Sequence, residues 1–380
     1  MTREEALAHF ERNYVWPKEQ AFLRTLEERY RAMRDELVPG FLDAFRRVCR
    51  QAGVQQAAGT RGPLGYITCA MLRTALADGL LSHRLTAQGR EWYLDPVDCE
   101  TEYDAAWAFC YLDDLGKELE LVRKRYMNLI LPPDIDGIKR RAAGRCNLFV
   151  VALARYAVPK AVLLPEYQAL ARAEVFEIRV GEHRDWTELV YKEDRREKDP
   201  VEVKQWLEAK EEGAYSYEVF AGLDLVAGDY GGIDLCFADL RGADLSGSNL
   251  REANLAGAKC SDAIMRGVNL GRALIRGADF QGANLQGAIL RAVEGAVDPA
   301  TETADTQEWA GPVLDGVCFA GADLTGVDFS QADLRGADFR RANLAATSFS
   351  DARLDGAVFS VDAAGIAGLT EEKRDVVRWE

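Results

Sequence analysis

The sequence predicts two domains: a mixed, mainly helical α+β domain over residues 1–216 and a narrow solenoid over residues 217–360, with a C-terminal capping helix in residues 361–380. Three observations lead to this prediction. The chain of 380 residues exceeds the usual size of one hydrophobic core. Its first half has apolar residues at helical spacing and no repeat. Its second half repeats apolar residues every five positions, which neither a helix nor a strand can place on one face.

Composition and charge narrow the possible functions. Hydrophobic residues make up 48% and charged residues 29% of the chain, which indicates a folded protein rather than a disordered one. The net charge of −15 disfavours direct binding of nucleic acid or anionic lipid, because both need excess Lys and Arg. The most apolar stretch, 146–164, contains Arg155, Pro159 and Lys160, so we expect a buried helix and no membrane contact.

The cysteines and the opening residues indicate the compartment. The eight cysteines are neither clustered nor spaced as CxxC, so we expect reduced thiols. The first residues are mostly polar and contain no apolar core of a secretory signal. Together these features predict a cytoplasmic protein.

Helices dominate the first half. Helical spacing predicts one helix over 22–37 and another over 41–52, separated by Gly40. A long helix is expected from just after Thr101 to Pro132. Residues 146–164 predict a further helix, interrupted at Pro159.

Two strand pairs and a linking helix complete the first half. Residues 84–88 and 91–94 flank Gly89, and residues 175–180 and 186–191 flank a second turn. A charged helix should begin at Asp199 and reach Gly213, and we expect it to bridge the two domains.

The repeat of the second half is strict. Apolar residues recur every five positions from Leu235 to Leu290, twelve in all, and again from Leu314 to Phe359, ten more. A small or β-branched residue stands two positions before each centre. Asp or Asn often lies between them, and Gly often follows two positions after the centre. Asp, Asn and Gly favour turns, so the chain should turn by a fixed amount in each unit and stack its centres around one axis.

Two pentads carry a family resemblance. Residues 243–247 (ADLSG) and 337–341 (ADFRR) resemble the A(D/N)LXX unit of the pentapeptide-repeat family. The resemblance covers Ile233 to Phe359 and implies a right-handed quadrilateral β-helix with four pentapeptides per coil. We expect residues 218–232 to form an irregular first coil. A helix from Thr370 to Trp379 should cover the last coil, or alternatively make a dimer contact.

The repeat is interrupted at residues 291–313. This segment contains Glu294 and Trp309, which we consider candidate binding residues because long loops in compact arrays are often functional. A tolerated surface insertion is the equal alternative.

The richest polar and aromatic stretch of the first half lies between Arg61 and Asp95. Its candidate binding residues for an anionic ligand or an acidic partner surface are Arg61, Tyr66, Arg73, Arg90 and Trp92. Helical spacing would place Tyr66, Cys69 and Arg73 on one face.

The stretch also holds the two residues that could act as catalysts. Cys69 and His83 could form a nucleophile–base pair, although we interpret Cys69 as a buried helix residue. The three histidines lack ligand spacing and no phosphate- or dinucleotide-binding fingerprint occurs, so we expect no metal and no cofactor.

Three functions remain open. The first is an interaction protein whose rigid solenoid docks a protein or peptide partner, with specificity from the first domain. The second follows from the family resemblance, because some pentapeptide-repeat proteins protect DNA gyrase by mimicking DNA. Residues 216–360 hold 21 acidic and 11 basic residues, which fits such a mimic. The third is an enzyme or peptide-modifying factor with its site in the first domain or at the domain junction.

Overall fold

The computed structural model describes residues 1–72, 81–296, 311–312, 314–361 and 369–380. The chain divides into two compact units. Among the described residues, the first unit comprises Met1–Arg195 with 311–312, and the second comprises those from Arg196 onward. The second unit therefore begins before residue 217, where the repeat pattern places the domain boundary.

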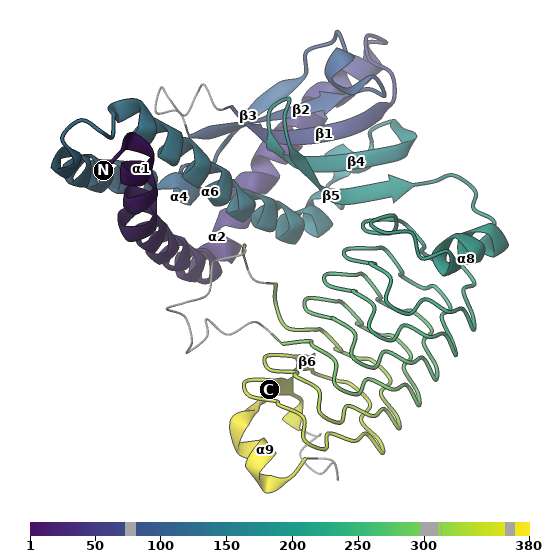
Figure 1. Cartoon of the computed structure of the whole chain (residues 1–380). Helices are drawn as coiled ribbons and strands as arrows, with labels where there is room; N and C mark the ends of the chain where they lie inside the picture. Colours follow the sequence, from purple (N-terminus) through teal and green to yellow (C-terminus); the bar gives the residue numbers. More distant parts are fainter. Residues whose placement is uncertain (73–80, 297–310, 313, 362–368) are drawn as a thin grey trace. The chain divides into compact units, whose positions relative to one another are not determined.

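A five-stranded sheet organises the first unit (Figure 1). The strands lie in the order β3-β2-β1-β4-β5. Their bounds are β1 Leu64–Met71, β2 Ser82–Gln88, β3 Glu100–Asp104, β4 Arg172–Glu182 and β5 Thr187–Asp194. All neighbours are antiparallel except β1 and β4, which run parallel. The predicted pairing of 175–180 with 186–191 is confirmed as β4 and β5.

Helices cover one face of this sheet and leave the other polar. Two long helices, α2 (Trp16–Ala57) and α6 (Pro132–Ala161), share a core with alternate residues of the strands, such as Ile67, Leu85 and Ile178. Because successive strand residues point to opposite faces, Tyr66, Thr86 and Arg179 lie on the other face. The sequence therefore folds into one apolar sheet face and one face that presents polar and aromatic side chains.

Several helix boundaries differ from the prediction. Gly40 does not end a helix, because α2 continues through Pro39 and Gly40. Val38 and Phe41 are buried on either side of the break, so core packing outweighs the local cost of these residues. Pro159 likewise lies inside α6 without interrupting it, two residues before the helix ends.

The long helix predicted after Thr101 is wrong. Thr101 belongs to β3, and the segment then forms α4 (Ala106–Phe109), α5 (Leu112–Arg123) and a short 3-10 turn (Lys124–Tyr126). Met127 and Asn128 adopt left-handed backbone angles and separate this segment from α6. The remaining short elements are α1 (Arg3–Phe10), a π-helical stretch (Glu11–Val15) and α7 (Pro165–Gln168).

One helix and one strand prediction near the candidate stretch also need correction. Residues 66–71, expected to be helical, form most of β1. Residues 84–88 lie in β2 as expected, but Trp92–Leu94 form a 3-10 turn and β2 pairs with β1 and β3. The chain turns at Trp92, whose φ of 50° is incompatible with an extended strand.

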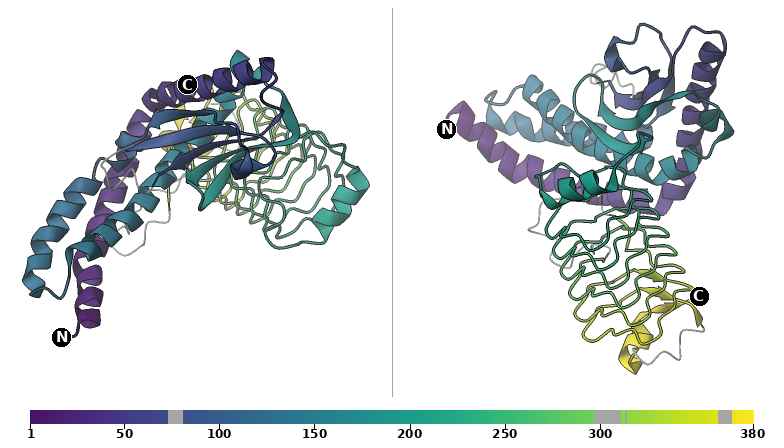
Figure 2. Two further views of the ribbon diagram at one scale, coloured as in Figure 1. Left: turned by 90° about the horizontal axis from the view of Figure 1, so that it is seen from above. Right: turned by 90° about the vertical axis from the view of Figure 1, so that its right-hand side faces the viewer.

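The second unit is a stack of coils in which each coil takes twenty residues (Figure 1, Figure 2). Outside the inserted segment, parallel bridges join each residue before a pentad centre to the residue twenty positions later, as in Asp244 with Ile264. Short strands β6 (Asp338–Phe339), β7 (Val358–Phe359) and β8 (Arg378–Trp379) continue the same pairing. Every predicted centre except Leu314 is buried to 1% exposure or less.

The four sides of a coil are named here after their first bridging residue. The Val219 side continues with Asp239 and Lys259, and the Asp224 side with Asp244 and Ile264. The Asp229 side continues with Asn249 and Asn269, and the Asp234 side with Asn254 and Leu274.

The pentad composition follows from this geometry. The Asp or Asn side chain before a centre accepts a hydrogen bond from the backbone two residues on, as Oδ1 of Asp244 does from Ser246 at 2.9 Å. The residue two after the centre turns the corner with a positive φ, for example 67° at Gly247. The centre's own N–H donates to the next coil, as Leu245 does to Ile264 at 2.7 Å.

Phenylalanines stack inside the last coils. The rings of Phe319 and Phe339 lie 5.3 Å apart and those of Phe339 and Phe359 lie 4.8 Å apart, nearly parallel in both cases. A second stack joins Phe329 and Phe349 at 5.4 Å. Offset stacking adds to the apolar burial of these rings, so this end of the solenoid has a continuous aromatic core.

Both ends of the solenoid are covered from within the second unit. At the first end, α8 (Pro200–Glu208) buries Val203 and Leu207 in the solenoid core, and Trp206 lies 5.0 Å from the ring of Tyr215. This helix was expected to bridge the domains, but it covers the first coil. The expected irregularity of that coil is also wrong, because Phe220 is fully buried and Val219 bridges to Asp239.

At the other end, the helix of the cap is shorter than predicted. The helix α9 spans only Glu371–Val376, and the chain then forms β8 beside β7. Trp379 lies 5.9 Å from Phe359, so the last pentad centre is covered by an aromatic residue that extends the ladder.

The inserted segment interrupts the coils one pentad later than predicted. The ladder continues through Glu294, which bridges back to Leu274 and forward to Asp333. Buried pentads resume with Val317 and Phe319, and Leu314 is not a centre. Most of the predicted insertion, with Trp309, lies outside the described residues.

We expect Phe339→Ala to destabilise the last coils by about 3 to 5 kcal/mol, because it removes the middle ring of a stack and leaves a cavity. Amide hydrogen exchange should become faster in residues 319–359 and stay unchanged in the first unit. Phe339→Leu, which restores the other common centre residue, should cost less than about 1.5 kcal/mol. Equal losses for the two variants would contradict the stacking argument.

Candidate binding surfaces of the two units

A buried ion pair shapes the loop that follows β2. Arg61 donates to a carboxylate oxygen of Asp95 at 2.7 Å, to Gln55 and to the backbone oxygen of Val97. Asp95 also accepts from the backbone N–H groups of Gly89 and Val97 at 2.6 and 2.9 Å. Burial alone would raise the pKa of Asp95, but these hydrogen bonds and the charge of Arg61 hold the pKa below its ordinary value.

This loop places an aromatic stack on the polar face of the sheet. The ring of Trp92 lies 4.8 Å from Tyr66 and 4.9 Å from Tyr93, and both pairs are nearly parallel. The guanidinium of Arg179 on β4 lies 5.4 Å from the Trp92 ring centre, within range of a cation–π interaction. Trp92 has a positive φ of 50°, which is strained for a bulky residue.

The stack contains buried polar atoms that the described residues leave unsatisfied. Nε1 of Trp92 and the hydroxyl of Tyr93 have no hydrogen-bond partner within the described part of the chain. Burying such groups without partners is costly. Together with the strained backbone at Trp92, this marks the loop as a functional candidate.

A pocket of about 240 Å³ lies next to Tyr66, where β1 and β4 diverge. Their pairing shifts register between Leu64 and Tyr66, and the pocket opens beside the shift. Arg90, Glu174 and Glu177 contribute its charged lining. Burial and the carboxylate of Glu177 raise the pKa of Tyr66, so its hydroxyl stays protonated. The arrangement can stack a flat group on Tyr66 and pair charges of either sign.

The structure thus brings together three of the five binding candidates of the first unit. Tyr66, Trp92 and Arg90 meet at the stack and pocket. Arg61 lies beneath the loop, where its side chain is 2% exposed and supports the loop instead of facing a ligand. Arg73 lies outside the described residues. Sequence reasoning missed Glu177 and Arg179, whose only signal is their alternation along β4.

Cys69 and His83 lie in the core, on the sheet face opposite the stack. Cys69 is fully buried, and burial raises the pKa of its thiol far above the ordinary value. Burial lowers the pKa of His83 to about 4, and its Nε2 hydrogen-bonds Asn147 at 2.7 Å. In this conformation neither group reaches solvent or substrate. The prediction of a buried Cys69 is right, but it lies in a strand and not in a helix.

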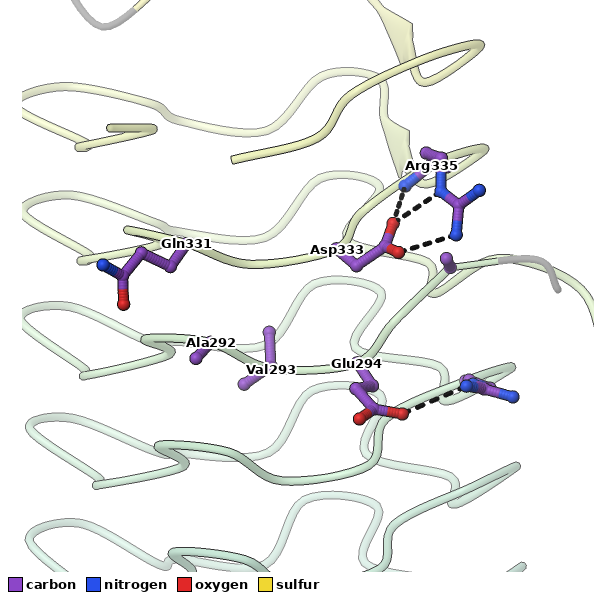
Figure 3. Close-up of a pocket in the computed structure, with 8 residues that line it drawn as sticks. Ala292, Val293, Glu294, Gln331, Asp333 and Arg335 are labelled. Carbon is purple, nitrogen blue, oxygen red and sulfur yellow. Dashed lines mark hydrogen bonds and ion pairs between the residues drawn. The ribbon is translucent and has the colours of Figure 1, made fainter. Parts of the chain in front are cut away.

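On the second unit, a pocket of about 390 Å³ opens beside Glu294 (Figure 3). Glu294 and Asp333 project from successive coils. Each carboxylate is paired: Glu294 with Arg276 at 3.0 Å, and Asp333 with Arg335 at 2.7 Å. The candidate Glu294 is therefore part of the regular ladder and lines a pocket whose charges are already balanced.

The same pairing extends along the coils. Asp239 pairs with Arg241 at 2.6 Å and Asp338 with Arg340 at 2.7 Å. Three of the repeated aspartates, Asp239, Asp333 and Asp338, thus pair with an arginine two residues later while Oδ1 also accepts from the backbone turn. The described coils present mixed charge instead of uninterrupted rows of free carboxylates.

Two other kinds of site are absent from the described part of the chain. Within the described residues, no group of three or more His, Cys, Asp or Glu side chains could hold a metal ion. None of the described helices is long and apolar enough to cross a membrane.

Comparison with known proteins identifies the repeats. The model of the pentapeptide-repeat family matches eight copies, at residues 231–259, 253–291 and 313–360. Residues 231–360 are therefore a pentapeptide-repeat region. No protein of curated function matches the chain.

Several solved structures are similar over the repeats. One is a pentapeptide repeat protein from the thylakoid lumen of Arabidopsis thaliana, 27% identical over 32% of this chain and 68% of that chain, with a TM-score of 0.21. HetL, involved in heterocyst differentiation regulation in Nostoc sp. strain PCC 7120, is 20% identical over 43% of this chain and 98% of that chain, with a TM-score of 0.17. QnrB1, a plasmid-mediated fluoroquinolone resistance protein, is 19% identical over 36% and 79% of the two chains, with a TM-score of 0.16.

We expect Arg61→Met to disorder the loop that holds Trp92, because it leaves the half-buried Asp95 without its cation, at a cost on the order of 3 kcal/mol. The indole resonance of Trp92 should shift and broaden. In the unchanged protein the pKa of Asp95 is depressed, so this stabilisation is present at neutral pH and is lost as the pH falls through the folded-state pKa.

Asp95→Asn is the matched control, because it keeps the shape of the side chain but removes the titrating group. Its Trp92 resonance should lose most of this acid-dependent change. An unchanged resonance in Arg61→Met would show that the ion pair does not hold the loop.

Proposed function

We propose that the pentapeptide-repeat region is a docking scaffold for a protein or peptide partner, and that the sheet-face stack of the first unit adds specificity. We also take the coils to form a right-handed quadrilateral and the two compact units to be separate domains. All eight cysteines are free, which supports the cytoplasm as the place of action.

The observation that carries this proposal is the closed, capped ladder. Backbone hydrogen bonds join every coil to the next, so the sides form a stiff surface with a fixed side-chain spacing. Segments of the same unit occupy both ends of the ladder, since α8 packs on the first coil and β8 pairs with the last. The sides of the coils are therefore the surface that remains for a partner.

The charge pattern favours docking over mimicry of a DNA duplex. A duplex mimic needs free negative charges at regular spacing, because its partner reads phosphates with Lys and Arg. Along the described coils, arginines pair with Asp239, Glu294, Asp333 and Asp338. Such a surface suits a partner with mixed charge.

Burial of the two potential catalysts disfavours the enzyme hypothesis. A nucleophilic thiolate needs a lowered pKa and access to substrate, whereas Cys69 has a raised pKa and no exposure. On the paired strands β1 and β2, Cys69 lies opposite Leu85, two residues from His83. Among the described residues, no hydrogen bond joins Cys69 to His83, whose Nε2 bonds Asn147 instead.

We expect a partner captured by the full chain to depend on one side of the coils or on two adjacent sides. Capture from cells of the native source would compare four charge reversals, one for each side: Arg340→Glu, Arg266→Glu, Arg251→Glu and Arg276→Glu. Binding should be lost for one or two adjacent sides and kept for the others, because a docked surface covers only part of a rod. Cys69→Ala serves as the control and should bind normally. The scaffold proposal would be contradicted if none of the four charge reversals abolished partner binding, or if no partner were captured reproducibly.

A second test addresses DNA gyrase. Since arginines pair with Asp239, Glu294, Asp333 and Asp338 and interrupt the negative surface, we expect no protection of gyrase supercoiling from ciprofloxacin at several-fold molar excess of the protein. A relaxed-plasmid supercoiling assay measures this directly. Restored supercoiling would support the mimic and identify gyrase as the partner.

A further inference from the structure

Two pentads carry an exposed isoleucine at the position before the centre, where Leu274 is also apolar but only partly exposed. Ile264 and Ile289 occupy the position before the centre, where Asp or Asn usually accepts the turn hydrogen bond. Their side chains are 40% and 45% exposed. On the described repeat coils, the only other exposed large apolar side chain is that of Val226.

These isoleucines do not serve the fold. In an ordinary pentad such as Asp244–Ser246, the side chain satisfies the backbone N–H two residues later. In the two isoleucine pentads that N–H belongs to Arg266 and Arg291, and neither has a side-chain acceptor among the described residues. Replacing a turn-forming acceptor with an exposed apolar side chain lowers the stability of the fold. A role other than folding must therefore favour the two isoleucines.

The two residues flank one edge of the coils. Ile264 lies on the Asp224 side and bridges to Asn284, while Ile289 lies on the adjacent Asp229 side and bridges to Asn269. They therefore occupy neighbouring coils, on either side of the corner formed by Gly267 and Gly287. A Cβ added at either glycine would meet nothing within 4 Å. The corner residues along this edge are all small: Ala227, Gly247, Gly267, Gly287, Gly326 and Ala346.

Each isoleucine is followed two residues later by an arginine on the same side. The side chain of Arg266 makes no hydrogen bond or ion pair with any described residue, although its charge helps to lower the pKa of Asp323. Among the described residues, the side chain of Arg291 hydrogen-bonds only the amide oxygen of Gln331, at 3.4 Å. The nearby carboxylate of Asp323 is instead held by Thr325 and Gln286. This contrasts with the arginines that neutralise carboxylates elsewhere on the coils.

We propose that this isoleucine edge, defined by Ile264, Arg266, Ile289 and Arg291 around Gly267 and Gly287, is where the partner docks. Its occupant is an acidic segment of a partner protein that also carries large apolar side chains. The apolar groups cover the isoleucines, the bare corner lets the partner's backbone approach, and the carboxylates pair with the arginines. The inference rests on the scaffold function proposed above and names the side and the chemistry of the partner.

Charge complementarity selects this occupant over the others. Nucleic acid offers phosphates to the two arginines but no large apolar side chains to cover the isoleucines. A second copy of this chain is the remaining alternative, and the experiment includes it as an outcome.

The test restores the repeat pattern. Ile264→Asn with Ile289→Asn should keep or raise the thermal midpoint of the protein, because the turn acceptors return. The same double variant should weaken binding of a fluorescent peptide of repeated Glu-Glu-Leu-Leu by about tenfold or more. Leu274→Asn is the matched control, since it makes the same change at the same pentad position on the Asp234 side. It should bind as the unchanged protein does.

Four comparisons can overturn the inference. It fails if the unchanged chain does not bind the acidic apolar peptide, if the double variant binds equally well, or if a Lys-Lys-Leu-Leu peptide binds as tightly. Sedimentation velocity provides the last comparison: a dimer that the double variant abolishes would show that a second copy occupies the edge. If Arg276→Glu or Arg340→Glu abolishes partner capture while Arg266→Glu does not, the scaffold stands and only this edge is wrong.

Discussion

The coil-to-coil backbone ladder is the constraint on which the second unit depends. Each residue before a pentad centre must meet its counterpart twenty positions later, so the chain can turn only in units of five. That requirement places a small residue against the interior, a hydrogen-bond acceptor at the turn and a residue tolerant of positive φ at the corner. Where Phe237 or Arg341 takes the corner in place of glycine, the ladder still forms, so tertiary pairing outweighs the local preference.

The parts of the fold that the sequence predicted well are those with a strict period. The pentad centres from Leu235 onward are buried as expected, because one repeated local rule is enough to place them. The first unit follows no such rule. Residues 66–71 alternate between two sheet faces, yet their apolar spacing also fits a helix, and only the pairing with β2 and β4 resolves the choice. Local signals at Pro39 and Gly40 likewise predicted a helix end that the core contacts of Val38 and Phe41 override.

The candidate site of the first unit shows where single-sequence reasoning reaches its limit. Tyr66, Arg90 and Trp92 could be selected from one polar and aromatic stretch. The groups that complete the site, Glu177 and Arg179, come from a strand far along the chain, and no local feature links them to Trp92. Arg61 was selected for its charge, but its contacts with Asp95 and Val97 show a role in holding the loop. Its burial could not be inferred without the loop's path.

The inserted segment reveals a useful property of the ladder. Glu294 and Asp333 are neighbours on the same side although 39 positions separate them, whereas uninterrupted coils use twenty. The number of additional residues in this coil is not a multiple of five, yet every later pentad keeps its orientation. Orientation is therefore reset by pairing with the coil below and does not depend on counting residues from the start. A foreign sequence of arbitrary length could accordingly be exchanged at this junction without rotating the downstream surface, which makes the junction a natural grafting point for engineering.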